Sequence, residues 1–337
     1  MRYLIVVLIC GLLFSCNGDK NPDVSNIKIN LQTQRFEQDF FAIDTNNVIA
    51  AINKLEEKYP TFTKPYLIRI LGVDENWGGD TTSYYVKDFI KYYATVYDST
   101  KKDFTNFSSY EAKIKKAFQY FKYYFPNYKL PTKLITFIGP ANGVSNAPFE
   151  DKMIIGLQAH LGKDFPLYKT ESVRETYPDY VSANFTADFI EINTMQSLIN
   201  DLLSYATPDE DKRLVIQMVE NGKRLYLLQK LLPKVEEYKL MHYTAVQMKD
   251  CYAGEAKIWN LFMQNNYLQE SNPELIKNYI SAGPKTQELG EDAPGNVGTF
   301  SGWQIVKKYA SKNPKVSLDS LMRTSNELIF KEAKYKP

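Results

Sequence analysis

One cysteine of the sequence stands where a covalent modification is expected. Arg2 gives the N-terminus a positive charge, and an apolar run of about a dozen residues follows it. A transmembrane helix needs roughly 20 apolar residues, so this run is too short to be one. The residues LFSC, ending at Cys16, then match the bacterial lipobox. We predict a lipoprotein signal peptide over residues 1–15 and acylation of Cys16 by fatty acids such as palmitate. The alternative is an ordinary signal peptide with an incidental cysteine.

Side chains that serve metals and nucleophilic catalysis are scarce. His160 and His242 are the two histidines, and no H-E-x-x-H motif or pair of histidines on one helix face is present. No G-x-S-x-G motif occurs, and Cys251 lies on an apolar stripe, where a thiol is inert. We therefore assign no catalytic residue, no metal and no cofactor. A zinc site from both histidines and an acid such as Glu255 would require long-range convergence.

Four charged side chains remain as candidates for a buried polar site. Glu255 interrupts an apolar helical stripe, and we interpret it as a hydrogen-bonded acid at the edge of the core. The sharper alternative is an acid of raised pKa in a cleft. Lys223 is a candidate partner for that acid, but we favour a solvated lysine at this position. Asp188 and Glu191 lie three residues apart near a helix start. They can form a carboxylate pair, but we favour an interaction with the helix dipole.

Composition limits the partners. The chain of 337 residues has 41 basic and 39 acidic side chains and a net charge of +2, without the concentrated basic patch of a nucleic-acid binder. Membrane attachment therefore falls to the acyl chains on Cys16. Twenty-five tyrosines and nineteen phenylalanines include clusters such as YFKYYFPNY. We favour aromatic packing for them over a sugar-stacking platform. No motif identifies a small-molecule ligand.

The pattern along the chain predicts one predominantly helical α+β domain. We expect a polar tether over residues 16–33 and the globular domain over residues 34–337. Helices are predicted at 47–58, 84–97 and 110–124, and almost throughout after residue 185. Two short apolar runs at 133–139 and 152–160 predict neighbouring strands, as a hairpin with a long loop or a small sheet.

Two of the helices can be derived from individual residues. Leucines and Met218 recur at helical spacing from Leu214 to Leu232, and Pro233 ends the pattern. Gly222 falls on this apolar stripe, where its missing side chain lets another backbone approach. A second helix begins at Thr244, with Gln247 three residues later as in a capping box, and its stripe runs to Phe262.

Glycines gather between Gly283 and Gly302. A long irregular segment inside a compact domain is often functional, so we treat this loop as a candidate surface for a partner. Trp303 is expected to fix its end in the core. The residues expected to shape the candidate loop are Pro294, Gly295, Gly298, Gly302 and Trp303. The alternative is that the loop only packs over the domain.

Several motifs resemble one family when taken in order. They are LFSC, RFEQDFF, FIGP, GLQAHLGKDFPLY, MVENGKRLYLLQKLLP, CYAGEAKIW and PGNVGTFSGWQIVKKY. They resemble the GldB family of gliding-motility lipoproteins of Bacteroidetes, from about residue 34 to the end. The resemblance implies a cell-envelope lipoprotein whose partners are other gliding proteins and the type IX secretion machinery, with no established reaction.

A more distant similarity is to predicted zinc-dependent proteases. These carry H-E-x-x-H on the first of two helices, but the corresponding region here, NFTADFIEINTMQSLINDLL, has no histidine. Asn221-Gly222 stands where those proteases have a downstream E-G. This similarity implies a degenerate zincin-like fold and a pseudo-enzyme. The function alternatives are a hydrolase with a site rebuilt from acids and a glycan-binding lipoprotein.

The Cys16→Ser variant is expected to fold normally and to leave the membrane fraction. The polar tether separates the anchor from the domain, and each buried CH₂ of an acyl chain contributes about 0.8 kcal/mol to membrane binding. Metabolic labelling with a clickable fatty acid, followed by fractionation, measures acylation and attachment together. A variant that stays membrane-bound and unlabelled would show that a partner, not lipid, holds the protein.

Overall fold

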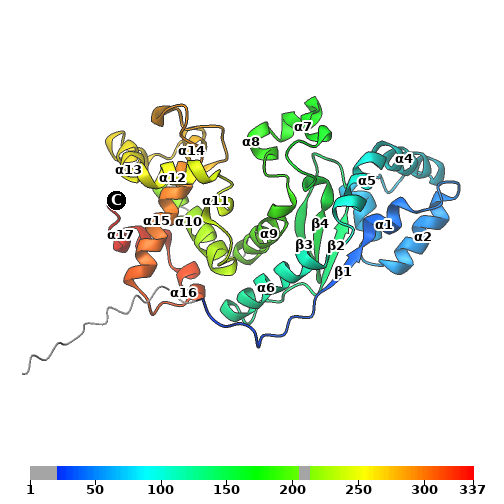
Figure 1. Cartoon of the computed structure of the whole chain (residues 1–337), viewed down its shortest axis with the longest axis horizontal. Coiled ribbons are helices and arrows are strands. Elements are labelled where there is room, and N and C mark those ends of the chain that lie inside the picture. Colours follow the sequence, from blue (N-terminus) through cyan, green and yellow to red (C-terminus); the bar gives the residue numbers. More distant parts are fainter. Residues whose placement is uncertain (1–20, 205–212) are drawn as a thin grey trace, which may run out of the picture.

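The computed structural model describes residues 21–204 and 213–337 (Figure 1). The predicted signal peptide and Cys16 lie outside the described residues. Helices dominate, and a small mixed sheet supplies the strands, which confirms the prediction of a predominantly helical α+β fold. The sheet and the helices up to α6 form one half of the body, α10 to α17 form the other, and α9 lies between them (Figure 1).

The first half of the chain supplies the sheet and the helices that cover it. Its elements are β1 (Gln32–Arg35), α1 (Phe36–Phe41), α2 (Val48–Lys58), α3 (Thr63–Pro65), η1 (Tyr66–Ile70), α4 (Gly79–Tyr92), α5 (Ala94–Asp103), α6 (Ser108–Tyr124), β2 (Lys133–Phe137), β3 (Asn146–Phe149), β4 (Lys152–Gly156) and η2 (Leu157–Ala159).

The secondary-structure elements described in the second half of the chain are all helices. Its elements are η3 (Pro166–Lys169), α7 (Glu171–Thr176), α8 (Asp179–Ser182), η4 (Ala187–Phe189), α9 (Ile190–Ser204), α10 (Leu214–Leu231), α11 (Glu237–Leu240), α12 (Ala245–Ala253), α13 (Glu255–Gln264), η5 (Tyr267–Gln269), α14 (Pro273–Ile280), η6 (Gln287–Leu289), α15 (Val297–Lys312), α16 (Leu318–Arg323) and α17 (Asn326–Ala333).

The sheet has the strand order β1-β2-β4-β3. The two predicted strands, β2 and β4, are neighbours, but they run parallel, so the predicted hairpin between them is wrong. The actual hairpin joins β4 to β3, which lies in the predicted loop and pairs antiparallel at the sheet edge. Strand β3 contains Pro148, which is tolerated at an edge because no ladder hydrogen bond is needed there. Strand β1, QTQR, is polar and gave no apolar signal.

The central strands separate two hydrophobic cores. Leu134 and Ile155 face the core that α6 and α9 share with the C-terminal helices. Ile135, Phe137 and Ile154 face the second core, formed with α1 to α5. Because β2 and β4 are covered on both faces, they have continuous apolar sequences rather than alternating ones.

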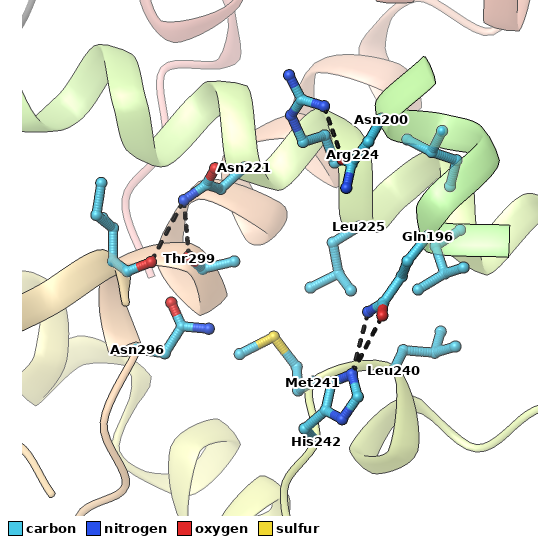
Figure 2. A pocket seen from close by; sticks show the side chains of 13 residues that line it. Gln196, Asn200, Asn221, Arg224, Leu225, Leu240, Met241, His242, Asn296 and Thr299 are labelled. Atoms are coloured by element: carbon cyan, nitrogen blue, oxygen red, sulfur yellow. Dashed lines mark hydrogen bonds between the residues drawn. The ribbon is translucent and has the colours of Figure 1, made fainter. Parts of the chain in front are cut away.

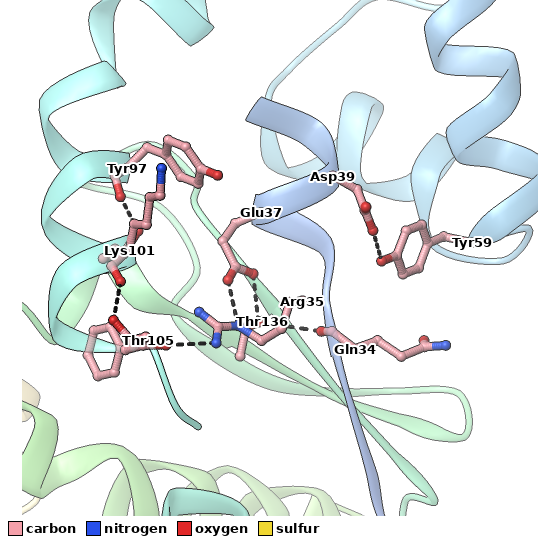
Figure 3. A network of polar contacts seen from close by, with 11 residues as sticks. Gln34, Arg35, Glu37, Asp39, Tyr59, Tyr97, Lys101, Thr105 and Thr136 are labelled. Carbon is pink, nitrogen blue, oxygen red and sulfur yellow. Dashed lines mark hydrogen bonds and ion pairs between the residues drawn. The ribbon is translucent and has the colours of Figure 1, made fainter. Parts of the chain in front are cut away.

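A buried ion pair ties the start of the domain to the sheet (Figure 3). Glu37 is 1% exposed and accepts hydrogen bonds from Arg35 Nε at 2.7 Å and Thr136 Oγ1 at 2.6 Å. Arg35 Nη1 also donates to the carbonyl of Phe104 at 2.7 Å. Burial raises the pKa of Glu37, while the charge of Arg35 opposes that rise. Arg35 and Glu37 of the motif RFEQDFF therefore have a structural role.

The ordered domain begins earlier than the sequence predicted. Val24 is fully buried and Leu31 is 4% exposed, although both lie in the predicted tether. Gln119 of α6 donates to the carbonyl of Ile27 at 2.8 Å, and the segment runs extended to β1 (Figure 1). The few apolar side chains of this segment pack on the domain. Because most of their neighbours in the sequence are polar, composition alone indicated a tether.

Some of the observed helices lie close to the predicted bounds, and others are divided. Helices α2 and α6 match the predicted 47–58 and 110–124, and the capping box of Thr244 and Gln247 is confirmed. The predicted helix at 84–97 is two helices that meet at Tyr93. The helix predicted from Thr244 to Phe262 also breaks, at Gly254, into α12 and α13.

Two glycines bring the backbones of α10 and α15 together. A Cβ on Gly222 would lie 2.6 Å from the backbone nitrogen of Trp303 and closer still to Gly302. A Cβ on Gly302 would overlap the carbonyl group of Met218. The predicted close approach at Gly222 is thus confirmed, and Trp303, which is 0% exposed, is fixed in the core as expected.

Gly302→Ala is expected to lower the free energy of unfolding by about 3 kcal/mol, because the new methyl group meets backbone atoms that cannot move aside as a side chain can. Gly79→Ala, in the first turn of α4, is the matched control: its Cβ would lie 3.5 Å from Ile49 Cγ1, an ordinary contact. Urea unfolding of both variants measures the difference. Equal stabilities would contradict a backbone contact at Gly302.

Candidate functional site

A pocket of about 260 Å³ lies where α9, α10, α14 and the start of α15 meet the turn after α11 (Figure 2). We call it the amide pocket, because four carboxamide side chains line it. Its lining residues are Gln196, Ile199, Asn200, Asn221, Arg224, Leu225, Leu228, Leu240, Met241, His242, Ile280, Asn296 and Thr299.

Helices α9 and α10 position three of the four carboxamides. Gln196 and Asn200 are four residues apart on α9 and so share one face of the helix. From α10, Asn221 Nδ2 donates to Thr299 Oγ1 at 3.3 Å. Arg224 Nη1 donates to Asn200 Oδ1 at 3.0 Å. The polar wall is therefore built across both helices and α15.

His242 closes the pocket beside Gln196. Its backbone has a left-handed φ of 56°, and its ring stacks on Phe189 with centroids 4.9 Å apart. His242 Nε2 lies 3.1 Å from Gln196 Nε2 and 3.4 Å from Gln196 Oε1, so a neutral imidazole bonds this carboxamide as acceptor or donor according to its tautomer. Although the residue keeps some exposed surface, burial of the ring lowers the pKa of His242 to about 4. The imidazole is uncharged near neutral pH.

The fourth carboxamide, Asn296, precedes α15 and points into the pocket between Asn221 and Met241 (Figure 2). Its φ of 63° is left-handed, a conformation that asparagine tolerates better than most residues. Its Oδ1 is buried and has no hydrogen-bond partner among the described residues. A buried acceptor in this condition has an unfavourable free energy until a donor reaches it.

The candidate partner loop is buried at the residues that the sequence singled out. Pro294, Gly295, Gly298, Gly302 and Trp303 are all buried, so they do not form an exposed surface. The segment is also shorter than predicted, because α15 already begins at Val297. Hydrogen bonds hold it: Thr286 Oγ1 donates to the Pro294 carbonyl at 2.7 Å, and the Tyr243 hydroxyl donates to the Gly295 carbonyl at 2.6 Å. This packing fixes Asn296 at the pocket.

The structure places the four charged candidates outside the amide pocket. Glu255 is partly buried and accepts a hydrogen bond from the Tyr335 hydroxyl at 2.5 Å. This agrees with its interpretation as a hydrogen-bonded acid at the edge of the core. Lys223 is buried and donates to the Thr324 carbonyl and to Asn326 Oδ1, each at 3.0 Å. The expectation of a solvated Lys223 is therefore wrong, and so is its suggested pairing with Glu255.

Asp188 and Glu191 both lie at the start of α9, where the helix dipole favours carboxylates. Asp188 pairs with Lys239 at 3.1 Å and is exposed. Burial raises the pKa of Glu191. Their different partners and surroundings argue against a shared carboxylate site.

The two histidines are held in separate places. His160 Nδ1 lies 3.2 Å from the carbonyl oxygen of Thr186, and burial lowers the pKa of His160 to about 4. Cys251 is buried, and burial raises the pKa of its thiol to about 12, which keeps the thiol protonated and unreactive. Over residues 21–204 and 213–337, no three His, Cys, Asp or Glu side chains are grouped to hold a metal.

Sequence reasoning missed most of the amide pocket. It identified Asn221 only through the distant resemblance to zinc proteases, and it placed Gln196 and Asn200 within the corresponding helix without assigning them a role. The available signal was two carboxamides at i, i+4 spacing on one predicted helix. Asn296 lies in the candidate loop between Gly283 and Gly302, but the sequence gave its side chain no role, because its contribution depends on how the loop packs.

Comparison with known proteins gives one match. The family model of gliding motility protein GldB matches residues 17–337. No curated protein and no solved structure matches the chain significantly, so the predicted zincin-like character gains no support. Among the helices of the described ranges, none has both the length and the apolar character needed to span a bilayer.

Both histidines are expected to titrate near pH 4 rather than near 6.5. The unfolded chain takes up these protons below about pH 6.5 and the folded chain only near pH 4, so stability falls as pH drops through this window. For the buried His160 the loss is on the order of 3 kcal/mol. NMR titration of the full chain without a histidine tag, with urea unfolding at each pH, measures both. Titration of either ring near 6.5 would contradict its burial as a neutral side chain.

Proposed function

The chain belongs to the GldB family of gliding-motility lipoproteins, and from this premise we propose that it is a non-catalytic component of the gliding apparatus and the associated type IX secretion machinery. Acyl chains on Cys16 hold it at the cell envelope. Its described domain acts by binding another envelope component through the amide pocket. No nucleic acid takes part.

The chemistry of the pocket lining is the observation that carries this proposal. Gln196, Asn200, Asn221 and Asn296 converge on one pocket. Carboxamides donate and accept hydrogen bonds, but they neither exchange protons near neutral pH nor act as the usual ligands of zinc, which are thiolate, imidazole and carboxylate. The one imidazole in the lining, His242, is neutral and is bonded to Gln196. Such a lining is suited to recognition.

A hydrolase with an acidic site is the alternative from another class. Glu255 and Lys307 line a second, separate pocket near the C-terminus, and burial lowers the pKa of Lys307. They are the acid and the base that this alternative would use, and Lys307 Nζ already pairs with Glu237 Oε1 at 2.6 Å. Lys308 and Lys336 also line this second pocket, which is open to solvent. It supports catalysis less strongly than the convergent carboxamides support binding.

The glycan-binding alternative draws less support from the structure. In the aromatic cluster at residues 120–128, Phe121 and Phe125 are buried and pack against each other with centroids 5.4 Å apart. Tyr123 is exposed, but a stacking platform needs several rings on one surface. This cluster contributes mainly to the core.

Glu255→Gln is expected to leave gliding close to the wild-type level when the full-length variant replaces the protein in gliding cells. Glutamine still accepts the hydrogen bond from Tyr335, whereas it cannot transfer a proton. Asp188→Asn and Glu191→Gln serve as matched acid-to-amide variants, and melting temperatures exclude misfolding. Gliding speed and secretion of cargo are the measurements.

Loss of gliding in Glu255→Gln with an unchanged melting temperature would favour the hydrolase. Stoichiometric zinc in the purified full-length protein together with peptide turnover would also overturn the non-catalytic proposal.

A further inference from the structure

We propose that the amide pocket binds an uncharged peptide segment of a partner protein, with an aliphatic side chain on the pocket floor and the peptide groups bonded to the carboxamides. This inference rests on the proposed binding function, for which it names the ligand chemistry. Four features of the pocket lead to it: its charge, its hydrogen-bonding groups, its apolar floor and its size.

The pocket offers no unbalanced charge to a ligand. Arg224 is the one basic side chain in the lining that is charged at neutral pH. Its Nη2 pairs with Glu220 Oε1 at 2.9 Å, and its Nη1 bonds Asn200 at 3.0 Å. His242 is neutral because its ring is buried. A ligand with a net charge would lose its hydration without gaining an opposite charge.

The hydrogen-bonding groups match a peptide backbone. Each peptide unit presents one N–H donor and one C=O acceptor, and each carboxamide presents both kinds of group. Asn296 Oδ1 is a buried acceptor without a partner among the described residues. With the Asn296 side chain turned toward the pocket space, a peptide N–H would supply the missing donor. Gln196 and Asn200 lie on the opposite wall, on α9, and offer further amide groups.

The floor of the pocket is aliphatic. Leu225, Leu228 and Leu240, all buried, form this part of the lining together with Met241 and Ile280. The lining contains no phenylalanine, tyrosine or tryptophan, so a sugar ring would find no aromatic face to stack on. A leucine-like side chain fits such a floor by burying apolar surface against it.

The size of the pocket limits the ligand to a short segment. Its volume of about 260 Å³ is just below the range of about 300–1,000 Å³ that is typical of small-molecule sites. One aliphatic residue with its two flanking peptide groups is therefore the unit that we expect it to recognise. The rest of the partner would lie outside the pocket.

The test uses N-acetyl-leucine N′-methylamide, which carries one aliphatic side chain between two peptide groups. The full-length protein is labelled at histidine, and the probe is titrated while both histidine ring signals are followed by NMR. His242 lines the pocket and His160 does not. We expect the His242 signal to shift with saturation and the His160 signal to stay in place.

Asn296→Gly is the decisive variant, because glycine adopts the left-handed φ of 63° without strain and removes only the carboxamide. We expect at least about tenfold weaker binding, the change that corresponds to 1.4 kcal/mol. Asn266→Gly is the matched control: Asn266 also has a left-handed φ, of 55°, and lies outside the pocket. It should bind like the wild type.

Several outcomes would overturn the inference. One is that Asn296→Gly binds the probe as tightly as the wild type does. Another is that the His242 signal does not shift at the highest soluble concentration of the probe. A third is that maltose or N-acetyl-glutamate N′-methylamide binds more tightly than the leucine probe. If one of these occurs while Glu255→Gln still supports gliding, the ligand class is wrong and the proposed function stands. If Glu255→Gln stops gliding with an unchanged melting temperature, the proposed function fails, whatever the probe does.

Discussion

The close backbone contact between α10 and α15 is the constraint on which the amide pocket depends. Gly222 and Gly302 have no side chains to hold the two helices apart. Asn221 is the neighbour of Gly222 on α10, and it bonds Thr299, one turn before Gly302 on α15. The same contact holds the start of α15, and with it Asn296, against the pocket. Without it, Asn221 of α10 and Asn296, which precedes α15, would not converge.

Local patterns predicted the parts of the fold that depend on neighbouring residues in the chain. The stripe with Gly222 and the capping box at Thr244 are properties of single helices, and both were found from the sequence. Sheet topology depends on distant pairing, which apolar runs do not encode. Strand β1 is polar, and β3 contains proline. For the same reason, apolar runs could not distinguish parallel strands from a hairpin.

The candidate site was hard to predict for a different reason. Sequence reasoning favoured groups that titrate, such as Glu255 and Lys223, and the structure gives both of them hydrogen bonds within the fold. An Asn or Gln in a sequence does not by itself indicate a site, because carboxamides are common on protein surfaces. Their meaning here comes from convergence and from the unpartnered oxygen of Asn296. One of the motifs that carry the family resemblance also has a structural role, since RFEQDFF supplies the ion pair of Arg35 and Glu37.

Photo-crosslinking inside gliding cells shows whether the amide pocket recognises a polypeptide. A photo-reactive amino acid would replace Asn200, an exposed residue of the pocket lining, and Asn266 would serve as the control position. We expect a discrete protein adduct from position 200 that disappears when Asn296→Gly is added and does not form from position 266. The same adducts from both positions, or an adduct unaffected by Asn296→Gly, would contradict it.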